Sequence, residues 1–255
     1  MNIISYNVNG IRAAERKGLS EWLQVEQPDV FCIQELKANQ DQIDVSVFEN
    51  LGYHIYWHSA EKKGYSGVGI FTKVKPKNVE IGCGMPEYDR EGRVIRADFE
   101  GFSVICTYMP SGSSGDTRQD FKMKWLSDFR NYIQELKKDY PNLLICGDYN
   151  ICHQAIDIHD PVRNKNSSGF LPEEREWMTE FLSDGFIDTF RYLNKEADQY
   201  SWWSYRAAAR ERNKGWRIDY HMLSDNLQDR IKSVDILQDV KHSDHCPIKI
   251  ELDVS

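Results

Sequence analysis

The sequence predicts an α/β (α+β) fold, a four-layer sandwich in which two packed, mostly antiparallel or mixed β-sheets are flanked by helices. Short apolar or alternating runs typical of strands recur along the whole chain, whereas helical periodicities are few and unevenly spaced. A regular doubly wound sheet needs the two in alternation, so it fits poorly. No repeat of fixed period and no Pro/Ser-rich or charged linker interrupts the sequence, and we expect one domain over residues 1–255.

The expected strands follow from runs of alternating or continuous apolar residues. In chain order they lie at residues 2–8, 30–34, 54–59, 67–72, 94–99, 102–108, 143–146, 200–203, 218–223, 231–237 and 247–252.

Three helices are expected from apolar residues repeating at steps of three and four. The longest has a capping-box pattern at 116–119 and stops at Tyr140-Pro141. A second covers 172–184 with Pro172 in its first turn, and a third covers about 17–25.

Composition restricts where and how the protein acts. The apolar runs are too short to span a bilayer, and the first residues enter a strand pattern without the basic start of a secretory signal, so we expect a cytoplasmic protein that acts at the nucleoid, with no membrane partner. The six cysteines show no CxxC spacing, which predicts reduced thiols and no zinc.

The net charge of −8 argues against binding nucleic acid through overall positive charge, so a polyanion must meet a local patch. Residues 206–217 provide one, because five positive side chains against Glu211 leave a charge of +4. Trp202, Trp203, Tyr205 and Trp216 surround it, a combination that suits stacking on bases or filling a gap in a duplex. Strand alternation favours a core position for Trp203.

Acidic and amide residues stand where the predicted strands end, which is where a sheet presents side chains to a cleft. They are Asn7, Asn9, Glu35, Asp148, Asn150 and Asp219, joined by the adjacent pair Asp244-His245. Each has a structural alternative, such as a turn or a surface loop, but their repetition at strand ends favours a site. The set is rich in hard oxygen ligands, which suits Mg²⁺, with Mn²⁺ as a substitute.

Seven motifs occur in order along the chain. They are Tyr6-Asn7-Val8-Asn9-Gly10-Ile11-Arg12, Ile33-Gln34-Glu35, Gly64-Tyr65-Ser66-Gly67-Val68-Gly69, Glu91-Gly92-Arg93-Val94, Gly147-Asp148-Tyr149-Asn150, Gly215-Trp216-Arg217-Ile218-Asp219-Tyr220 and Ser243-Asp244-His245-Cys246-Pro247. On these motifs the chain closely resembles the exonuclease III family of apurinic/apyrimidinic endonucleases, within the endonuclease/exonuclease/phosphatase superfamily. The runs at 64–69 and 215–220 narrow the resemblance to the DNA-repair branch.

The resemblance implies a role for each matching residue. Glu35 is expected to be the principal metal ligand, with Asn7 close to the ion and Asp244 near a second or alternative metal position. His245, oriented by Asp219, would contact the phosphate. The wider implied sets are catalytic Tyr108, Asp148, Asn150, Asp219 and His245, and metal-site Asn7, Glu35, Asp148, Asn150, Asp244 and His245. The sequence leaves open whether one ion or two bind, and whether Asp148 or His245 is the base.

The resemblance also implies a small apolar pocket for a flipped-out abasic sugar. The residues implied for DNA or for this pocket are Asn9, Arg93, Ser111, Trp202, Arg206, Trp216 and Ile218. Arg206 begins a short helical turn that could enter a DNA groove or lie on a solvated surface. Two positions depart from the family pattern: Asn9 stands where some members carry Asp, and Ser111 where Asn is common.

The expected function is a divalent-metal-dependent DNA repair nuclease, acting as a monomer on double-stranded DNA with abasic sites or blocked 3′ ends. It would cut 5′ to the abasic site, with 3′–5′ exonuclease and 3′-end-trimming activity. Two alternatives stay open: a phosphatase or phosphodiesterase for another substrate, and a non-catalytic module that binds abasic DNA.

Overall fold

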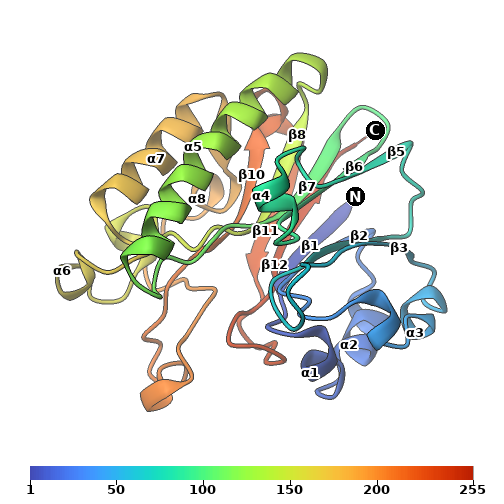
Figure 1. Ribbon diagram of the computed structural model, residues 1–255, viewed down its shortest axis with the longest axis horizontal. Coiled ribbons are helices and arrows are strands. Elements are labelled where there is room, and N and C mark those ends of the chain that lie inside the picture. The colour runs from blue at the N-terminus through green and yellow to red at the C-terminus, as the bar shows by residue number, and fades with distance from the viewer. Residues whose placement is uncertain (255) are drawn as a thin grey trace.

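The computed structural model describes residues 1–254 and shows two six-stranded sheets packed face to face (Figure 1). The first sheet has the order β11 (Ile231–Ile236), β12 (Ile248–Leu252), β1 (Asn2–Asn7), β2 (Val30–Gln34), β4 (Val68–Thr72) and β3 (His54–His58). The second has the order β5 (Asn78–Ile81), β6 (Val94–Asp98), β7 (Ser103–Tyr108), β8 (Leu143–Asp148), β10 (Asp219–Ser224) and β9 (Phe186–Asp188). In each sheet one central pair is parallel, β1–β2 and β7–β8, and all other neighbours are antiparallel.

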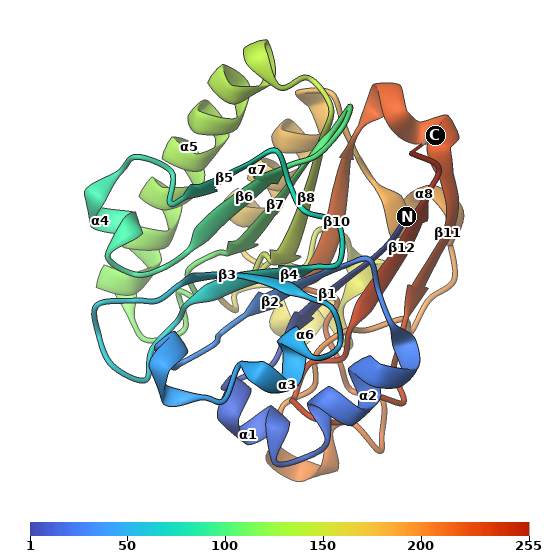
Figure 2. The same cartoon turned by 90° about the vertical axis from the view of Figure 1, so that its right-hand side faces the viewer.

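Helices cover the outer face of each sheet, so the predicted four-layer sandwich is confirmed (Figures 1 and 2). The helices are α1 (Ile11–Glu15), α2 (Leu19–Glu26), α3 (Ser46–Glu49), α4 (Pro86–Asp89), α5 (Asp116–Asp139), α6 (Pro161–Asn164), α7 (Pro172–Ser183) and α8 (Thr189–Leu193). Helices α1 to α3 lie against the first sheet, and α5 and α7 lie side by side against the second. Within residues 1–254, no helix has the length and apolar character needed to cross a bilayer.

Three apolar layers hold the sandwich together. The central layer lies between the sheets and contains Cys32, Cys106 and Cys146, which behave as small buried hydrophobes. The outer layers lie under α1 to α3 and under α5 and α7. All six cysteines lie in the described part of the chain, and each is free.

The structure corrects three expectations about local elements. Residues 200–203 form no strand, because Trp202 makes only isolated bridges to Trp216 and His245. The short edge strands β5 and β9 were not predicted, since four and three residues carry too little alternation to be recognised. Helix α5 is capped by Gly115 without a side-chain hydrogen bond, so the predicted capping box is absent there.

Candidate active site

A cavity of about 340 Å³ opens at one end of the sandwich. Strands β1, β2, β7 and β8 end there, and their antiparallel neighbours β10 and β12 begin there. Ten of the predicted site residues line the cavity: Glu35, Tyr108, Ser111, Asp148, Asn150, Trp202, Trp216, Ile218, Asp244 and His245.

Asn7 joins the two sheets at the floor of this cavity. Its Nδ2 donates to Glu35 Oε1 at 2.8 Å and to Asp148 Oδ2 at 2.9 Å, so one buried amide holds carboxylates from both sheets. Its Oδ1 accepts the backbone N–H of Asn9 at 3.0 Å. Asn7 therefore orients the two carboxylates, and it would offer oxygen to a metal only with its amide turned over.

The Gly-Asp-x-Asn motif has a geometric cause. A Cβ on Gly147 would lie 1.8 Å from the carbonyl oxygen of Thr107, so only glycine lets β8 run this close to β7 just before Asp148. Two residues on, Asn150 donates its backbone N–H to Asp148 Oδ1 at 2.8 Å and its side-chain amide to Met109 O at 2.9 Å.

Backbone strain gathers at the same end. Five non-glycine residues here adopt left-handed φ angles: Asn9 (47°), Glu35 (52°), Lys37 (51°), Ser66 (47°) and Asn150 (51°). Such conformations cost about 1 kcal/mol or more each and persist where the surrounding structure determines them. The strained loops thus hold Glu35 and Asn150 facing the cavity.

A buried chain of hydrogen bonds fixes the imidazole. Ser201 Oγ donates to Asp219 Oδ2 at 2.6 Å, and the same oxygen lies 2.9 Å from His245 Nδ1. The other ring nitrogen, Nε2, lies 3.8 Å from Asp148 Oδ2. His245 is therefore held from behind by one carboxylate and faces another.

The pKa values of both members of this pair are raised. Burial alone would lower the pKa of His245, but the charges of Asp219 and Asp148 raise it to about 10. The pKa of Asp148 is raised to about 7, mainly by burial. The charge of His245 lowers this pKa, whereas the charges of Asp219 and Glu35 raise it further. At neutral pH the imidazole is thus charged, and the carboxyl of Asp148 is poised to gain or lose a proton.

Asp244 lies beside the site and is already engaged. Its Oδ1 accepts Asn9 Nδ2 at 2.9 Å and its Oδ2 accepts Trp202 Nε1 at 3.0 Å. Burial opposes ionisation, but the neighbouring imidazolium and these hydrogen bonds lower the pKa of Asp244 overall. Lys37 Nζ lies 2.7 Å from Glu35 Oε2 and also donates to Asn9 Oδ1. Lys37 was not among the predicted site residues. The sequence feature that could have indicated it is its position two residues after Glu35.

Tyr108 rests on a buried arginine. The Arg93 guanidinium lies 5.0 Å from the Tyr108 ring centroid and donates to the Tyr108 carbonyl at 2.8 Å. Its other donors reach Glu91 and Tyr65, and only 1% of its surface is exposed. The expected DNA contact of Arg93 does not fit this burial, since the side chain supports Tyr108 from below. Burial and the nearby carboxylates keep the pKa of Tyr108 well above its usual value, so the phenol stays a donor.

One wall of the cavity is apolar. Trp202 and Trp216 meet edge to face with ring centroids 5.9 Å apart, and Ile218 packs with them in one cluster. Ser111 stands across the opening, where its Oγ lies 2.9 Å from Ser113 Oγ. The predicted pocket residues Trp202, Trp216 and Ile218 are therefore brought together, next to the polar groups.

The basic segment is less available than its sequence indicates. Arg217 is buried and ion-paired with Asp157 (2.8 Å) and Asp188 (2.6 Å), and Arg210 donates to backbone carbonyls over the Trp203 ring. The exposed cations of the basic segment 206–217 are Arg206, Arg212 and Lys214. Arg206 begins a 3₁₀ turn, Arg206–Ala208, on the orange segment that projects at the lower left of Figure 1, outside the cavity lining. Trp203 is 2% exposed, so its predicted core position is confirmed.

The donor set fits a divalent cation. Glu35, Asp148 and His245 each offer a ligand atom, and these atoms lie within 4.8 Å of one another, the one such group of three found among residues 1–254. Carboxylate oxygens are the ligands that hard cations prefer. Asp244 lies outside this group of three.

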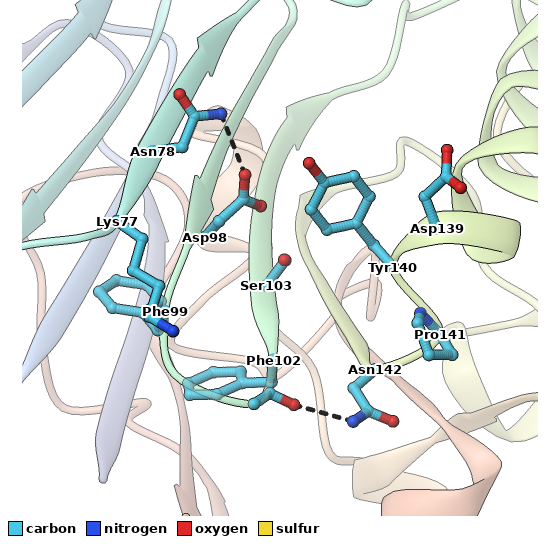
Figure 3. Close-up of a pocket in the computed structure, with 11 residues that line it drawn as sticks. Lys77, Asn78, Asp98, Phe99, Phe102, Ser103, Asp139, Tyr140, Pro141 and Asn142 are labelled. Atoms are coloured by element: carbon cyan, nitrogen blue, oxygen red, sulfur yellow. Dashed lines mark hydrogen bonds between the residues drawn. The ribbon is translucent and has the colours of Figure 1, made fainter.

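A second hollow of about 400 Å³ lies at the opposite end of the sandwich, beside the β6–β7 turn and the end of α5 (Figure 3). Asp98 is its buried carboxylate, and Arg96 and Asn78 already bond both oxygens. Phe99 and Phe102 stack beneath it. It contains no cluster of facing titratable groups comparable to that around His245.

The fold and the constellation around His245 define a class, the hydrolases of phosphate esters. The chain belongs to the Endonuclease/Exonuclease/phosphatase family, whose model matches residues 4–245. It is 44% identical to an exodeoxyribonuclease of Bacillus subtilis over the full length of both chains. Two solved structures share the fold: an AP endonuclease from Archaeoglobus fulgidus (TM-score 0.91, 30% identity, both chains covered fully) and a 3′ phosphatase from Neisseria bound to a product DNA hairpin (TM-score 0.91, 27% identity, 99% of each chain). The protein is thus a nuclease of this family, as its motifs predicted.

Proposed function

We propose that the protein is a DNA repair nuclease that cuts the backbone 5′ to abasic sites in duplex DNA. The observation that supports this best is the position of the apolar wall, because Trp202, Trp216 and Ile218 line the same cavity as Asp148 and His245. A sugar without its base would fit against that wall, while the adjacent phosphodiester would reach the polar residues. A normal nucleotide would be excluded by its size.

The metal in this proposal is Mg²⁺, with Mn²⁺ able to replace it. Glu35 and Asp148 would hold it, with Asn7 and Asp244 close by and His245 at the edge of the group. When bound, such an ion neutralises charge on the phosphate during hydrolysis.

The residues of the chain supply the remaining chemistry. Water adds to phosphorus, the bond to the 3′ oxygen breaks, and one proton must leave the water while another reaches the departing oxygen. The carboxylate of Asp148, whose Oδ2 lies 3.8 Å from His245 Nε2, is suited to accept the proton of the water. The charged His245 and the phenol of Tyr108 are donors to phosphate oxygens, and each such donor contributes about 3 kcal/mol to the stability of the transition state. Asn150 completes this donor set.

The proposal extends to activity at 3′ ends in the same site. Exonuclease and 3′-end trimming require the same hydrolysis with a terminal nucleotide or phosphate against the wall, and the family includes an exodeoxyribonuclease and a 3′ phosphatase. The proposal also includes a single catalytic domain over residues 1–255, a monomeric enzyme and a cytoplasmic site of action. Asn9 and Arg206 are expected near the DNA backbone, and Ser111 near the scissile phosphate.

The test uses duplex DNA with one tetrahydrofuran abasic analogue and a matched undamaged duplex. We expect cutting of the abasic strand with Mg²⁺, leaving a 3′-hydroxyl, and none in EDTA. Cutting that persists in EDTA, or no cutting with Mg²⁺, overturns the proposal. Turnover of a small phosphate monoester at a similar rate would favour a general phosphatase instead.

A further inference from the structure

A buried ion pair lies behind the cavity, between the two helices that cover the second sheet. Lys122 Nζ on α5 lies 2.6 Å from Glu174 Oε1 on α7, and both side chains are 0% exposed. Removing two charges from water costs several kcal/mol for each ion, and apolar residues of the same volume often stabilise a protein as well or better. Stability alone is therefore a weak reason for the pair.

Both members of the pair also hold backbone groups at the cavity. Lys122 Nζ donates to the carbonyl of Asn150 at 2.8 Å. Glu174 Oε2 accepts the N–H groups of Gly169 (2.6 Å) and Leu171 (3.0 Å). Asn150 and Gly169 line the cavity. One ion pair thus holds two separate parts of the cavity wall.

The segment held by Glu174 fits tightly against the apolar wall. Gly169 has a φ of +94°, and a Cβ there would lie 2.9 Å from Trp216 Cζ3 and 3.1 Å from Asn150 O. Its carbonyl accepts the N–H of Cys152 at 2.7 Å. A small shift of this segment would therefore move Trp216 relative to Asn150.

We propose that Lys122 and Glu174 are positioning residues that set the distance between Asn150 and the pocket wall at Gly169 and Trp216. This inference rests on the proposed function, because that distance is the one between the scissile phosphate and the abasic sugar. Burial lowers the pKa of Lys122 against the opposing charges of Glu174 and Asp148, consistent with a pair kept at a cost in desolvation.

The same two helices provide a matched control. Arg130 on α5 bonds Asp184 at 2.6 Å and pairs with Glu180 on α7, about two turns along the helix from Lys122. Arg130 is partly exposed and contacts no residue of the cavity lining. R130M therefore breaks an ion pair between α5 and α7 without touching the site.

The experiment compares the wild type, the double variant K122M/E174Q and R130M. On the abasic duplex, kcat/KM of the double variant should fall by about tenfold to a hundredfold, since small misplacements of reacting groups have effects of this size. In the protein without metal or DNA, amide exchange of peptides covering 169–171 should rise about tenfold, because hydrogen bonds to a charged acceptor are lost. R130M should match the wild type in both measurements, at temperatures where all three are folded.

The outcomes separate this inference from the proposed function. If the wild type fails to cut abasic DNA, the proposed function is wrong, while the exchange measurement still tests the positioning. Wild-type kinetics and exchange in the double variant, or equal losses in R130M, would overturn the positioning role. If the double variant does not fold, E174Q alone must show the faster exchange at 169–171 and the loss in kcat/KM, and wild-type values there overturn the inference.

Discussion

The two ends of the sandwich offer cavities of similar size but very different chemistry. At one end the cavity is about 340 Å³ and at the other about 400 Å³. In the smaller one, Asp148 Oδ2 lies 3.8 Å from His245 Nε2, and both residues are buried and have raised pKa values. At the larger one, both oxygens of Asp98 accept hydrogen bonds from Arg96 and Asn78, and the lining includes Phe99, Phe102 and Tyr140.

The difference shows that volume does not identify the site. The site is identified by titratable groups that shift one another's pKa values, because a carboxyl whose pKa lies near neutrality can accept and release protons. Backbone strain is also present at the active end, where Glu35 and Asn150 have left-handed φ angles. At the active end, left-handed backbone and buried charged groups occur together in residues that line the cavity.

The largest expected effect is a loss of activity on changing Asp148, the buried aspartate of the active end, compared with Asp98 at the other end. D148N should lower kcat on abasic DNA by about 10³-fold, because Asn cannot accept the proton of the attacking water. Its thermal stability should stay close to that of the wild type, since the remaining amide oxygen can accept the backbone N–H of Asn150 and the site no longer buries a charged carboxylate. Steady-state kinetics and thermal unfolding measure the two effects.

D98N is the matched change at the opposite end. It leaves Arg96 buried without its counter-charge, so the free energy of unfolding should fall by about 3 kcal/mol, while kcat below the melting range stays unchanged. Equal losses of activity in the two variants would remove the functional distinction between the ends.

A second prediction concerns pH and has an intermediate effect. The folded pKa of His245 lies near 10, above its ordinary 6.5, so the imidazolium is present at neutral pH and is lost as pH rises through about 10. D219N removes the carboxylate that holds this charge, and kcat should fall about a hundredfold. The alkaline limb of the pH–rate profile should also move to lower pH.

The control for this prediction is a group with the opposite shift. Burial lowers the pKa of His221 to about 3, so it is neutral across the working range. H221N should leave the profile in place. An alkaline limb that does not move in D219N would show that His245 does not act as the charged donor.

Much of the site could be read from the sequence because strand ends in a sandwich converge. Glu35, Asp148, Asn150 and Asp219 stand at such ends, and their meeting follows from the strand order. The strand pattern could not predict which cations of the basic segment 206–217 are exposed and free to contact DNA. The partners of Arg217 are 60 and 29 residues away in sequence, at Asp157 and Asp188.

The role of helix residues behind the wall was equally hidden. Lys122 and Glu174 look like the ordinary charged residues of amphipathic helices, and only their 0% exposure distinguishes them from Arg130. Ser201 gives no sequence signal either, because the segment around it, expected to be a strand, forms none. The burial and the partners of these residues depend on contacts between segments far apart in the chain, and these contacts cannot be predicted from one sequence.

The smallest expected effect tests whether the projecting segment at the active end contributes to DNA binding through charge. Arg206 is exposed and outside the cavity lining, so R206A should change kcat little and weaken binding of abasic duplex by less than about tenfold. If its guanidinium meets a phosphate, the slope of log K against log salt should decrease by about one. Lys77, an exposed cation at the opposite end, provides the control, and K77A should leave the slope unchanged. Equal slopes for the wild type and R206A would place Arg206 on a solvated surface, which was the alternative that its sequence left open.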